Sequence, residues 1–175
     1  MRAISVLVAT LLAATVLAQP KPSPRLGDLK AFAGEWTCKG TTFTSSFGPA
    51  HPTAATIHVS WVLGSYWLRA MYAETKTPKN PIPAAGHVYW GYDEQTKKLT
   101  GYAVNNFGGH VKVESDGWKG DTIVWSGTMS AAGMSFPTRD TFMRKSAKEI
   151  HHTTEAEIKN EWQKLDEETC KKTAS

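Results

Sequence analysis

The sequence predicts one small all-β domain: an antiparallel up-and-down β-barrel of about eight to ten strands, with a short helical plug at its N-terminal end. After Gly34 the chain consists of short runs rich in Thr, Val, Ile, Tyr and Trp, separated by Gly, Pro, Asn and Asp at fairly even spacing. This pattern is typical of antiparallel β-structure. The links between runs are short, as between neighbouring strands of a meander. Cys38 lies in the first run and Cys170 at the end of the last, and a closed barrel pairs these two strands.

The chain begins with the features of a secretory signal peptide. Arg2 precedes an apolar run from Ile4 to Leu17, and Val16-Leu17-Ala18 places small residues at the positions that a signal peptidase reads. We expect cleavage after Ala18 and a secreted or periplasmic protein. The run is shorter than the roughly 20 apolar residues of a membrane-spanning helix, and no Cys follows it to carry a lipid. We therefore expect no membrane anchor.

We divide the chain into a signal peptide over residues 1–18, an extended leader over 19–27 and a single barrel domain over 28–175. The prolines of Gln19-Pro-Lys-Pro-Ser-Pro24 favour extended backbone in the leader. Fewer than about 160 residues remain after cleavage, which suits one domain. The net charge of +4 includes Arg2, and the Lys residues are scattered among Asp and Glu. A nucleic-acid partner is therefore not expected, because it requires a clustered basic face.

The elements are expected in a simple order. Asp28 caps a helical stretch over Leu29-Lys-Ala-Phe-Ala33, which forms the plug, and nothing after residue 34 is expected to be helical. The predicted strands are 36–43, 55–62, 66–74, 87–93, 99–105, 110–114, 122–129, 137–144, 149–157 and 162–169.

Cys38 and Cys170 are the two cysteines of a chain that we expect to leave the cytosol. An oxidising compartment favours a disulfide between them. Neither belongs to a CxxC pair, so thiol redox catalysis and a zinc-thiolate site are disfavoured and no metal is expected. The bridge would close a loop of over 100 residues and would lock the first strand to the last.

Several motifs carry a resemblance to known families. Gly34-Glu35-Trp36, which follows the plug, resembles the Gly-x-Trp element of lipocalins and related calycin barrels, where the Trp packs at the closed end. The other motifs are Trp61-Val-Leu-Gly64, Gly91-Tyr-Asp93 with Thr96-Lys-Lys-Leu99, Gly108-Gly109, Trp162-Gln-Lys-Leu and Glu168-Thr-Cys-Lys171. Together they resemble the bacterial family called domain of unknown function 1579, whose members are often exported. The resemblance implies a calycin-like fold and no activity.

Strand alternation predicts a lined lumen. Tyr66, Leu68, Ala70 and Tyr72 alternate along one predicted strand and share one face. A barrel of about ten strands is wide enough to leave a cavity. Aromatic residues of the predicted strands would give such a cavity apolar walls with polar tips. The candidates are Tyr66, Tyr72, Tyr89, Trp90 and Tyr102; the alternative is that they are ordinary barrel core.

Two arginines interrupt otherwise apolar strands. Arg69 and Arg139, if they point inward, would each receive a carboxylate or phosphate of a ligand in a bidentate fashion. The alternative is an Arg on the outer face, or one stacked over Trp36 at the closed end. Asp140, beside Arg139, is interpreted as its partner in a surface ion pair.

His152 shares a strand face with Ile150, Thr154 and Ala156, so it is a candidate inward ligand. His151 points the opposite way, and the two therefore cannot chelate one ion. A single strand-borne His leaves haem binding as a minor alternative; a structural His is the simpler interpretation, and no cofactor is expected.

No catalytic motif is present: the chain lacks a G-x-S-x-G elbow, a G-x-G-x-x-G loop and a P-loop. We therefore favour a binding protein over an enzyme, with a small apolar or amphipathic molecule in the lumen and an Arg as its anchor. A cofactor-free isomerase or lyase acting in the same lumen remains an alternative, because some barrels host sites without local motifs. A packed structural or protein-interaction barrel is the third hypothesis.

Overall fold

The computed structural model describes residues 20–173. The predicted signal peptide and its cleavage position after Ala18 lie outside these residues. No helix within the described part of the chain is long and apolar enough to cross a membrane.

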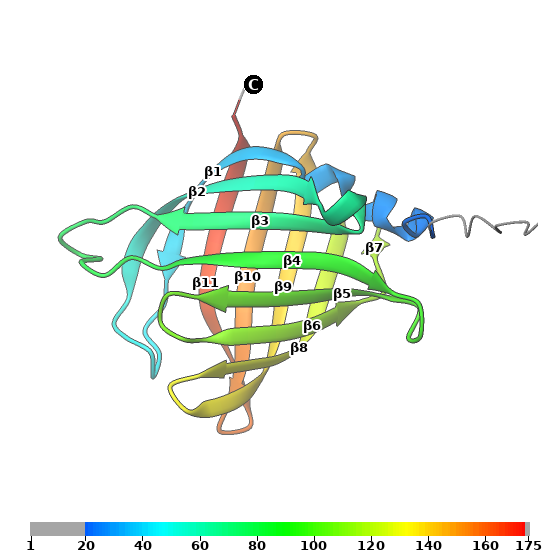
Figure 1. The fold of residues 1–175 in the computed structure, drawn as a ribbon. Coiled ribbons are helices and arrows are strands. Elements are labelled where there is room, and N and C mark those ends of the chain that lie inside the picture. Colours follow the sequence, from blue (N-terminus) through cyan, green and yellow to red (C-terminus); the bar gives the residue numbers. More distant parts are fainter. Residues whose placement is uncertain (1–19, 174–175) are drawn as a thin grey trace, which may run out of the picture.

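Ten long antiparallel strands form the domain, in chain order around a barrel (Figure 1). Their bounds, together with those of one two-residue strand, are β1 Gly34–Thr42, β2 His51–Val62, β3 Trp67–Glu74, β4 Ala85–Asp93, β5 Lys98–Asn105, β6 His110–Ser115, β7 Trp118–Lys119, β8 Thr122–Ala131, β9 Met134–Ser146, β10 Glu149–Ile158 and β11 Glu161–Lys172.

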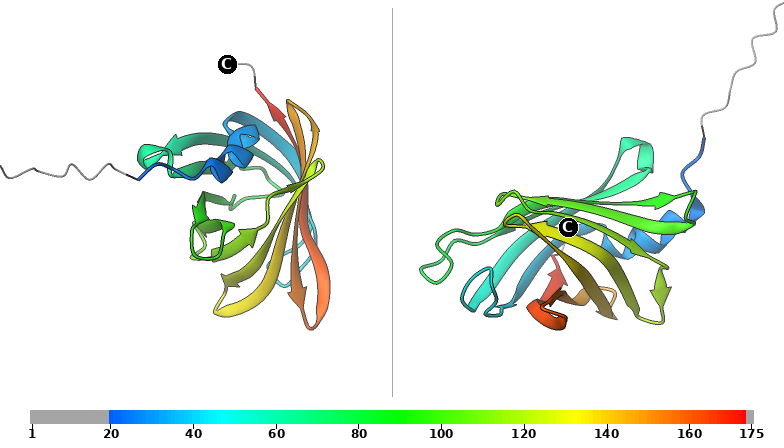
Figure 2. Two further views of the ribbon diagram at one scale, coloured as in Figure 1. Left: turned by 90° about the vertical axis from the view of Figure 1, so that its right-hand side faces the viewer. Right: turned by 90° about the horizontal axis from the view of Figure 1, so that it is seen from below.

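The barrel closes as the sequence predicts. β1 pairs with β2 on one side and with β11 on the other, and β6 pairs with β8 across the short β7 hairpin. Every long strand therefore has two neighbours, and no long edge is left free. Views from the side and from below show the strands curving around a central space (Figure 2). The all-β, up-and-down architecture is confirmed.

Two short elements were not predicted. β7 has only two residues, and the 3-10 turn η2, Leu63–Ser65, has three. Neither is long enough to produce a periodic pattern. η2 corrects the expectation that nothing after residue 34 is helical. Gly64 within it has a φ of 66°, a conformation that glycine adopts without the steric cost of a side chain.

The plug is a 3-10 helix, η1, Pro24–Phe32. It begins earlier than expected, and its cap is Ser23, whose hydroxyl accepts a hydrogen bond from the backbone of Arg25. Asp28 is therefore not the cap: it lies inside the helix, in an ion pair with Arg25 at 3.3 Å. A Ser followed by Pro at the first helical position is the stronger start signal.

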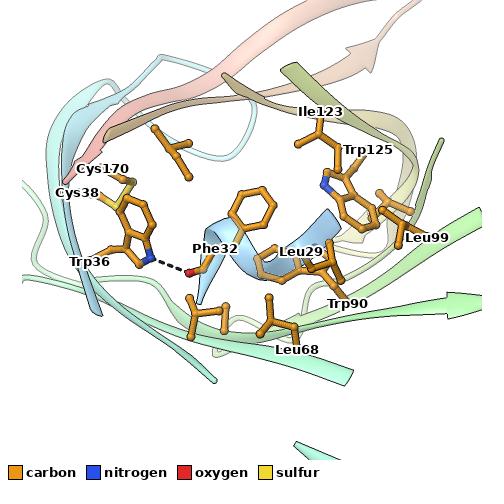
Figure 3. Close-up of a cluster of buried hydrophobic side chains, with 14 of the residues drawn as sticks. Leu29, Phe32, Trp36, Cys38, Leu68, Trp90, Leu99, Ile123, Trp125 and Cys170 are labelled. Carbon is orange, nitrogen blue, oxygen red and sulfur yellow. Dashed lines mark hydrogen bonds between the residues drawn. A yellow bond between two sulfur atoms is a disulfide. The ribbon is translucent and has the colours of Figure 1, made fainter. Parts of the chain in front are cut away.

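One end of the barrel is filled by the plug (Figure 3). Leu29 and Phe32 of η1 are buried, and the indole N–H of Trp36 donates a 2.7 Å hydrogen bond to the Phe32 carbonyl. The indole N–H of Trp118 donates to the Asp28 carbonyl, also at 2.7 Å. The middle and the C-terminal end of the helix are thus tied to the wall, and Trp36 packs at this closed end as the Gly-x-Trp resemblance implies.

The disulfide lies at the seam. Cys38 of β1 is paired in register with Cys170 of β11, and their sulfurs are bonded. The two residues are 132 positions apart in sequence. The bridge therefore connects the first strand to the last, where the sequence predicts it.

Candidate functional site

The half of the lumen away from the plug is hollow. A cavity of about 350 Å³ lies inside the barrel, lined by residues of nearly every long strand. Ligand sites in proteins commonly have volumes of about 300 to 1,000 Å³. The interior is therefore not fully packed, contrary to the hypothesis of a packed barrel.

One wall of the cavity is apolar. Trp90, Trp125 and Phe142 lie nearest the plug, and Phe32 packs on both Trp90 and Phe142 with ring centroids 5.4 and 5.2 Å away. The remaining apolar lining residues are Ala55, Ile57, Ala70, Ala84, Val88, Ala103, Val111, Val113, Met129 and Leu165.

A polar wall borders the apolar one, and most of its residues come from three consecutive strands, β9 to β11. Asp140 of β9, His152 and Thr154 of β10, and Asp166 and Glu168 of β11 all line the cavity. Each pair of neighbours is brought together by strand register: His152 is opposite Glu168, and Thr154 is opposite both Asp140 and Asp166. Residues directly opposite each other on one sheet face are in contact range. The sheet itself therefore assembles the cluster.

His152 is at the centre of this cluster. Its ring stacks on Phe142 with centroids 4.2 Å apart, and Nε2 lies 3.3 Å from Asp140 Oδ1. Burial disfavours the imidazolium, but the hydrogen bond to Asp140 and the charges of Asp166, Asp140 and Glu168 outweigh it and raise the pKa of His152 to about 9. We therefore expect His152 to be positively charged at neutral pH.

Asp166 is the most perturbed carboxyl group. Burial raises its pKa to about 7, against the opposing effect of His152, whose Nδ1 lies 4.0 Å from Asp166 Oδ1. That distance is too long for a hydrogen bond. Asp166 Oδ1 is buried and accepts no hydrogen bond from the described residues.

Glu168 and Tyr72 complete the polar wall. Burial raises the pKa of Glu168, whose Oε1 accepts a long, 3.4 Å hydrogen bond from Thr53. Burial and the nearby charge of Glu74 raise the pKa of Tyr72 to about 12, so its hydroxyl is neutral. The wall therefore combines hydroxyl groups and an imidazole with several carboxyl acceptors.

Four of the predicted site residues line the cavity, and three of them, Tyr72, Trp90 and His152, point into it. Tyr102 contributes to the lining, but its side chain is 43% exposed and its ring lies 6.0 Å from that of Trp67 on the outer face. Of the predicted residues, the structure thus brings together two aromatic side chains and the histidine.

Three other predicted residues lie outside the lumen. Tyr66 follows η2, and its hydroxyl donates to the Pro20 carbonyl. Arg69 and Tyr89 face each other between β3 and β4 on the outer surface. Strand alternation explains this, because Leu68 and Ala70, the neighbours of Arg69, are the inward, buried residues.

Arg139 is also outside, which corrects the prediction of an arginine anchor. Its guanidinium makes a bidentate pair with Glu155, at 2.6 and 3.0 Å, and lies 4.4 Å from the centre of the Trp162 ring. The hydrogen bond to Glu155 raises the pKa of Arg139 and lowers that of Glu155. The ligand of Arg139 is thus another residue of its own chain.

The interpretation of Asp140 as the surface partner of Arg139 is wrong as well. Adjacent strand residues point to opposite faces, so an outward Arg139 requires an inward Asp140. Strand alternation also predicts that the two acidic residues of β11 point inward. Cys170 must point inward to meet Cys38, and Glu168 and Asp166 lie on the same face as Cys170.

Haem does not fit His152. Iron binds a neutral imidazole nitrogen with a free lone pair. Nε2 lies 3.3 Å from Asp140 and 3.4 Å from the Thr154 hydroxyl, and the raised pKa favours the imidazolium. Both nitrogens face hydrogen-bonding or acidic groups, so the donor set disagrees with axial ligation.

A second group of possible metal ligands is formed by Cys38, Glu168 and Cys170, whose ligand atoms lie within 4.8 Å of one another. Both sulfurs belong to the disulfide. A bridged sulfur is not a thiolate, so this group is not a thiolate metal site.

A depression of about 450 Å³ lies at the plug end, bordered by Trp36, Asp121, Arg144 and Lys172 among others. It is more open than the lumen. Arg144 is paired with Asp121 at 2.9 Å, and Lys172 lies over the Trp36 ring at 5.1 Å. Its basic groups are therefore engaged, and the lumen is the better candidate site.

Comparisons with known proteins support the fold and leave the role open. A family model described as "Protein of unknown function (DUF1579)" matches residues 21–172. The crystal structure of Rv2717c from M. tuberculosis is similar with a TM-score of 0.68 and 10% sequence identity, over 88% of this chain and 100% of that one. At this identity the likeness concerns the fold alone. No curated protein matches the sequence.

Proposed function

Since the chain belongs to the DUF1579 family, whose description assigns no role, we propose from its geometry that it binds one small amphipathic molecule in the lumen of the barrel. The observation that carries this proposal is the division of the cavity into an apolar wall and a polar wall. Such sites combine hydrophobic area with a few placed polar groups.

The polar wall argues for an amphipathic ligand over a purely apolar one. Burying a polar group costs free energy unless it is hydrogen-bonded. Asp166 Oδ1 and the indole N–H of Trp125 line the cavity and have no hydrogen-bond partner among the described residues. A hydrocarbon would leave both unsatisfied, whereas a molecule with polar groups can satisfy them.

We also propose that the protein acts outside the cytosol. The predicted signal peptide and the disulfide between Cys38 and Cys170 both support this. Expression of the full chain and N-terminal sequencing of the exported product would test it. We expect a product that starts at Gln19; a cytosolic protein that retains Met1 would contradict export.

The lumen proposal is tested with a neutral fluorescent probe, N-phenyl-1-naphthylamine, whose emission rises in apolar surroundings. Ala70 lines the cavity and is 2% exposed, whereas Ala73 on the same strand is exposed on the outer face. We expect Ala70→Phe to weaken probe binding at least about tenfold, which corresponds to about 1.4 kcal/mol. Ala73→Phe, which makes the same change outside the lumen, should bind the probe like the unmodified protein.

A second filling variant keeps the test independent of any folding defect in Ala70→Phe. Val111 also lines the cavity, and the exposed Val124 is its outer-face control. If the unmodified protein does not bind the probe, or if Val111→Phe and Ala70→Phe bind it as well as their controls do, the lumen is not the binding site.

An isomerase or lyase is the second candidate function, favoured by the ionisable groups of the cavity. Asp166, with a pKa raised to about 7 by burial, is suited to accept a proton, and the imidazolium of His152 is suited to donate one. Two neighbouring groups, one that accepts a proton and one that donates it near neutral pH, are a common arrangement in acid and base catalysis. Incubation in D₂O of a molecule recovered with the purified protein would reveal hydrogen exchange; the exchange should be lost in Asp166→Asn. Binding without exchange would exclude this chemistry.

A further inference from the structure

We propose that the lumen selects a molecule carrying a protonated amine, with the N–H groups held by Asp166 and Glu168 and the hydrocarbon part against the aromatic wall. This inference rests on the proposed function of the lumen.

Acidic side chains dominate the charged groups of the cavity. Its lining includes four carboxyl groups, those of Glu74, Asp140, Asp166 and Glu168, and a single imidazole, that of His152. No Lys or Arg occurs among the described residues that line it. The chain as a whole carries a net charge of +4, so the lumen is acidic inside a basic protein. An anionic ligand would meet charges of its own sign, and a cation would meet the opposite sign.

The four carboxyl groups of the cavity differ in their hydrogen-bond partners. Glu74 Oε2 accepts hydrogen bonds from the Asn80 amide and the Ala84 backbone N–H, both at 2.8 Å. Asp140 Oδ1 accepts one from the Thr154 hydroxyl at 2.8 Å and faces His152. These two carboxylates are therefore satisfied within the protein.

Asp166 and Glu168 differ from the other two carboxylates. Asp166 Oδ1 has no hydrogen-bond donor among the described residues, and Glu168 has only the long contact with Thr53. Register places the two on the same face of β11, next to His152. An ammonium group has three N–H donors and no acceptor. It supplies what these two carboxylates lack.

Neither Arg139 nor Arg144 donates a hydrogen bond to Asp166 or Glu168. Arg139 is bound to Glu155 on the outer face, and Arg144 is bound to Asp121 at the plug end. His152 does not complete Asp166, because its Nδ1 remains 4.0 Å away. Asp166 Oδ1 is thus a buried acceptor without a donor among the described residues.

The apolar wall fits the other end of such a molecule. Trp90, Trp125 and Phe142 form the part of the cavity nearest the plug. Burial of hydrocarbon there is favourable by about 25 cal/mol for each Å² removed from water. Aromatic faces also attract cations. The wall is therefore compatible with both the hydrocarbon part and the ammonium group of an alkylamine.

The test compares three competitors of one chain length: octylamine, octanol and octanoate. Each is titrated at pH 8 against bound N-phenyl-1-naphthylamine, and alkylamines remain protonated at this pH. We expect octylamine to displace the probe at concentrations at least about tenfold lower than octanol, and octanoate to be the weakest. This comparison uses the unmodified protein, so its result does not depend on the folding of any variant.

Variants that remove one negative charge test which residues produce the preference for octylamine over octanol. Asp166→Asn and Glu168→Gln should each reduce the advantage of octylamine over octanol. Glu167→Gln is the matched control: Glu167 lies between them in sequence, faces outward and pairs with Lys164 at 2.7 Å. It should leave the advantage unchanged.

The failure of this inference differs from the failure of the proposed function. If the three competitors displace the probe equally, or if octanoate is strongest, the lumen binds amphipathic molecules without preference for amines and the inference is wrong. If the probe does not bind in the lumen, the proposed function fails. A preference for octylamine that survives in both Asp166→Asn and Glu168→Gln would also overturn the assignment to these residues.

Discussion

Cys38 and Cys170 lie directly opposite each other on the two strands that close the barrel, with their Cα atoms 3.9 Å apart. Strand pairing already places them side by side, so the disulfide adds a covalent link to a contact that the fold makes. Cys38 and Cys170 are 1% and 7% exposed. The bridge is thus buried at the seam and shielded from reductants in solution.

Removal of the disulfide should destabilise the protein. In the chain-entropy model, a link between residues 132 positions apart contributes about 4 to 5 kcal/mol. We expect the double variant Cys38→Ala/Cys170→Ala to lose about 2 to 5 kcal/mol of the free energy of unfolding, measured by guanidinium chloride denaturation. Unfolding in denaturant exposes the bridge, so reductant present during the titration should lower the midpoint of the unmodified protein and should leave that of the variant unchanged. Equal midpoints for the two proteins would contradict a stabilising bridge.

Most of the fold could be predicted from the sequence because it follows from local signals. Alternation and turn residues located all ten long strands, and the short links required an up-and-down order. The start of the plug was misplaced because Asp28 and Ser23 are both acceptable caps. The choice between them depends on Pro24 and on the burial of Leu26 against the barrel, which is a tertiary contact.

The loss of Arg139 should leave ligand binding unchanged. Its guanidinium is engaged by Glu155 and Trp162 on the outer face, so it does not reach the lumen. We expect Arg139→Ala to bind N-phenyl-1-naphthylamine like the unmodified protein, and to lose no more than about 1 kcal/mol of the free energy of unfolding, since the pair is partly exposed. A probe affinity lowered tenfold in a folded Arg139→Ala protein would restore the arginine anchor.

The candidate site was only partly predictable. His152 was placed inward correctly because Ile150 and Ala156 set the face of its strand. Asp166 and Glu168 are found only if alternation is counted back from Cys170, since the strand is irregular on the other side of Asp166, where Glu155 pairs with Lys164. A count from the Trp162 end of β11 crosses this bulge and assigns Asp166 to the wrong face. The acidic character of the lumen therefore depends on strand register, and composition alone does not reveal it.

A substitution at Gly40 tests how closely β1 and β11 pack at the seam. A Cβ at this position would lie 1.9 Å from the backbone oxygen of Glu167 on β11. We expect Gly40→Ala to cost about 2 kcal/mol or more of the free energy of unfolding, because backbone would have to move. Gly27 is the control: a Cβ there meets nothing within 4 Å, and Gly27→Ala should be neutral or stabilise by about 0.5 kcal/mol. Equal effects of the two substitutions in denaturation experiments would contradict this packing.

The polar wall should make the protein less stable as the pH rises. His152 has a pKa of about 9 in the folded state against a usual 6.5, so its contribution is complete below pH 6.5 and is lost as the pH rises through 9. Asp166 has a pKa of about 7 against a usual 3.8, so the folded state retains its proton longer, and stability falls between these values too. Denaturation midpoints should therefore decrease from pH 5 to pH 9.

Two variants separate these contributions by their pH windows. His152→Gln should remove the fall between pH 6.5 and 9, which for the shift in the pKa of His152 is on the order of 3 kcal/mol. Asp166→Asn should remove mainly the fall between 3.8 and 7. The groups that face His152 are Asp140, Asp166, Glu168 and Thr154, and only the carboxylates among them carry charge. Removal of Asp166 should therefore also lower the pKa of His152, measured by NMR titration of the imidazole signal that His152→Gln lacks. A His152 signal that titrates near 6.5 in the unmodified protein would show that the carboxylates do not hold the imidazolium.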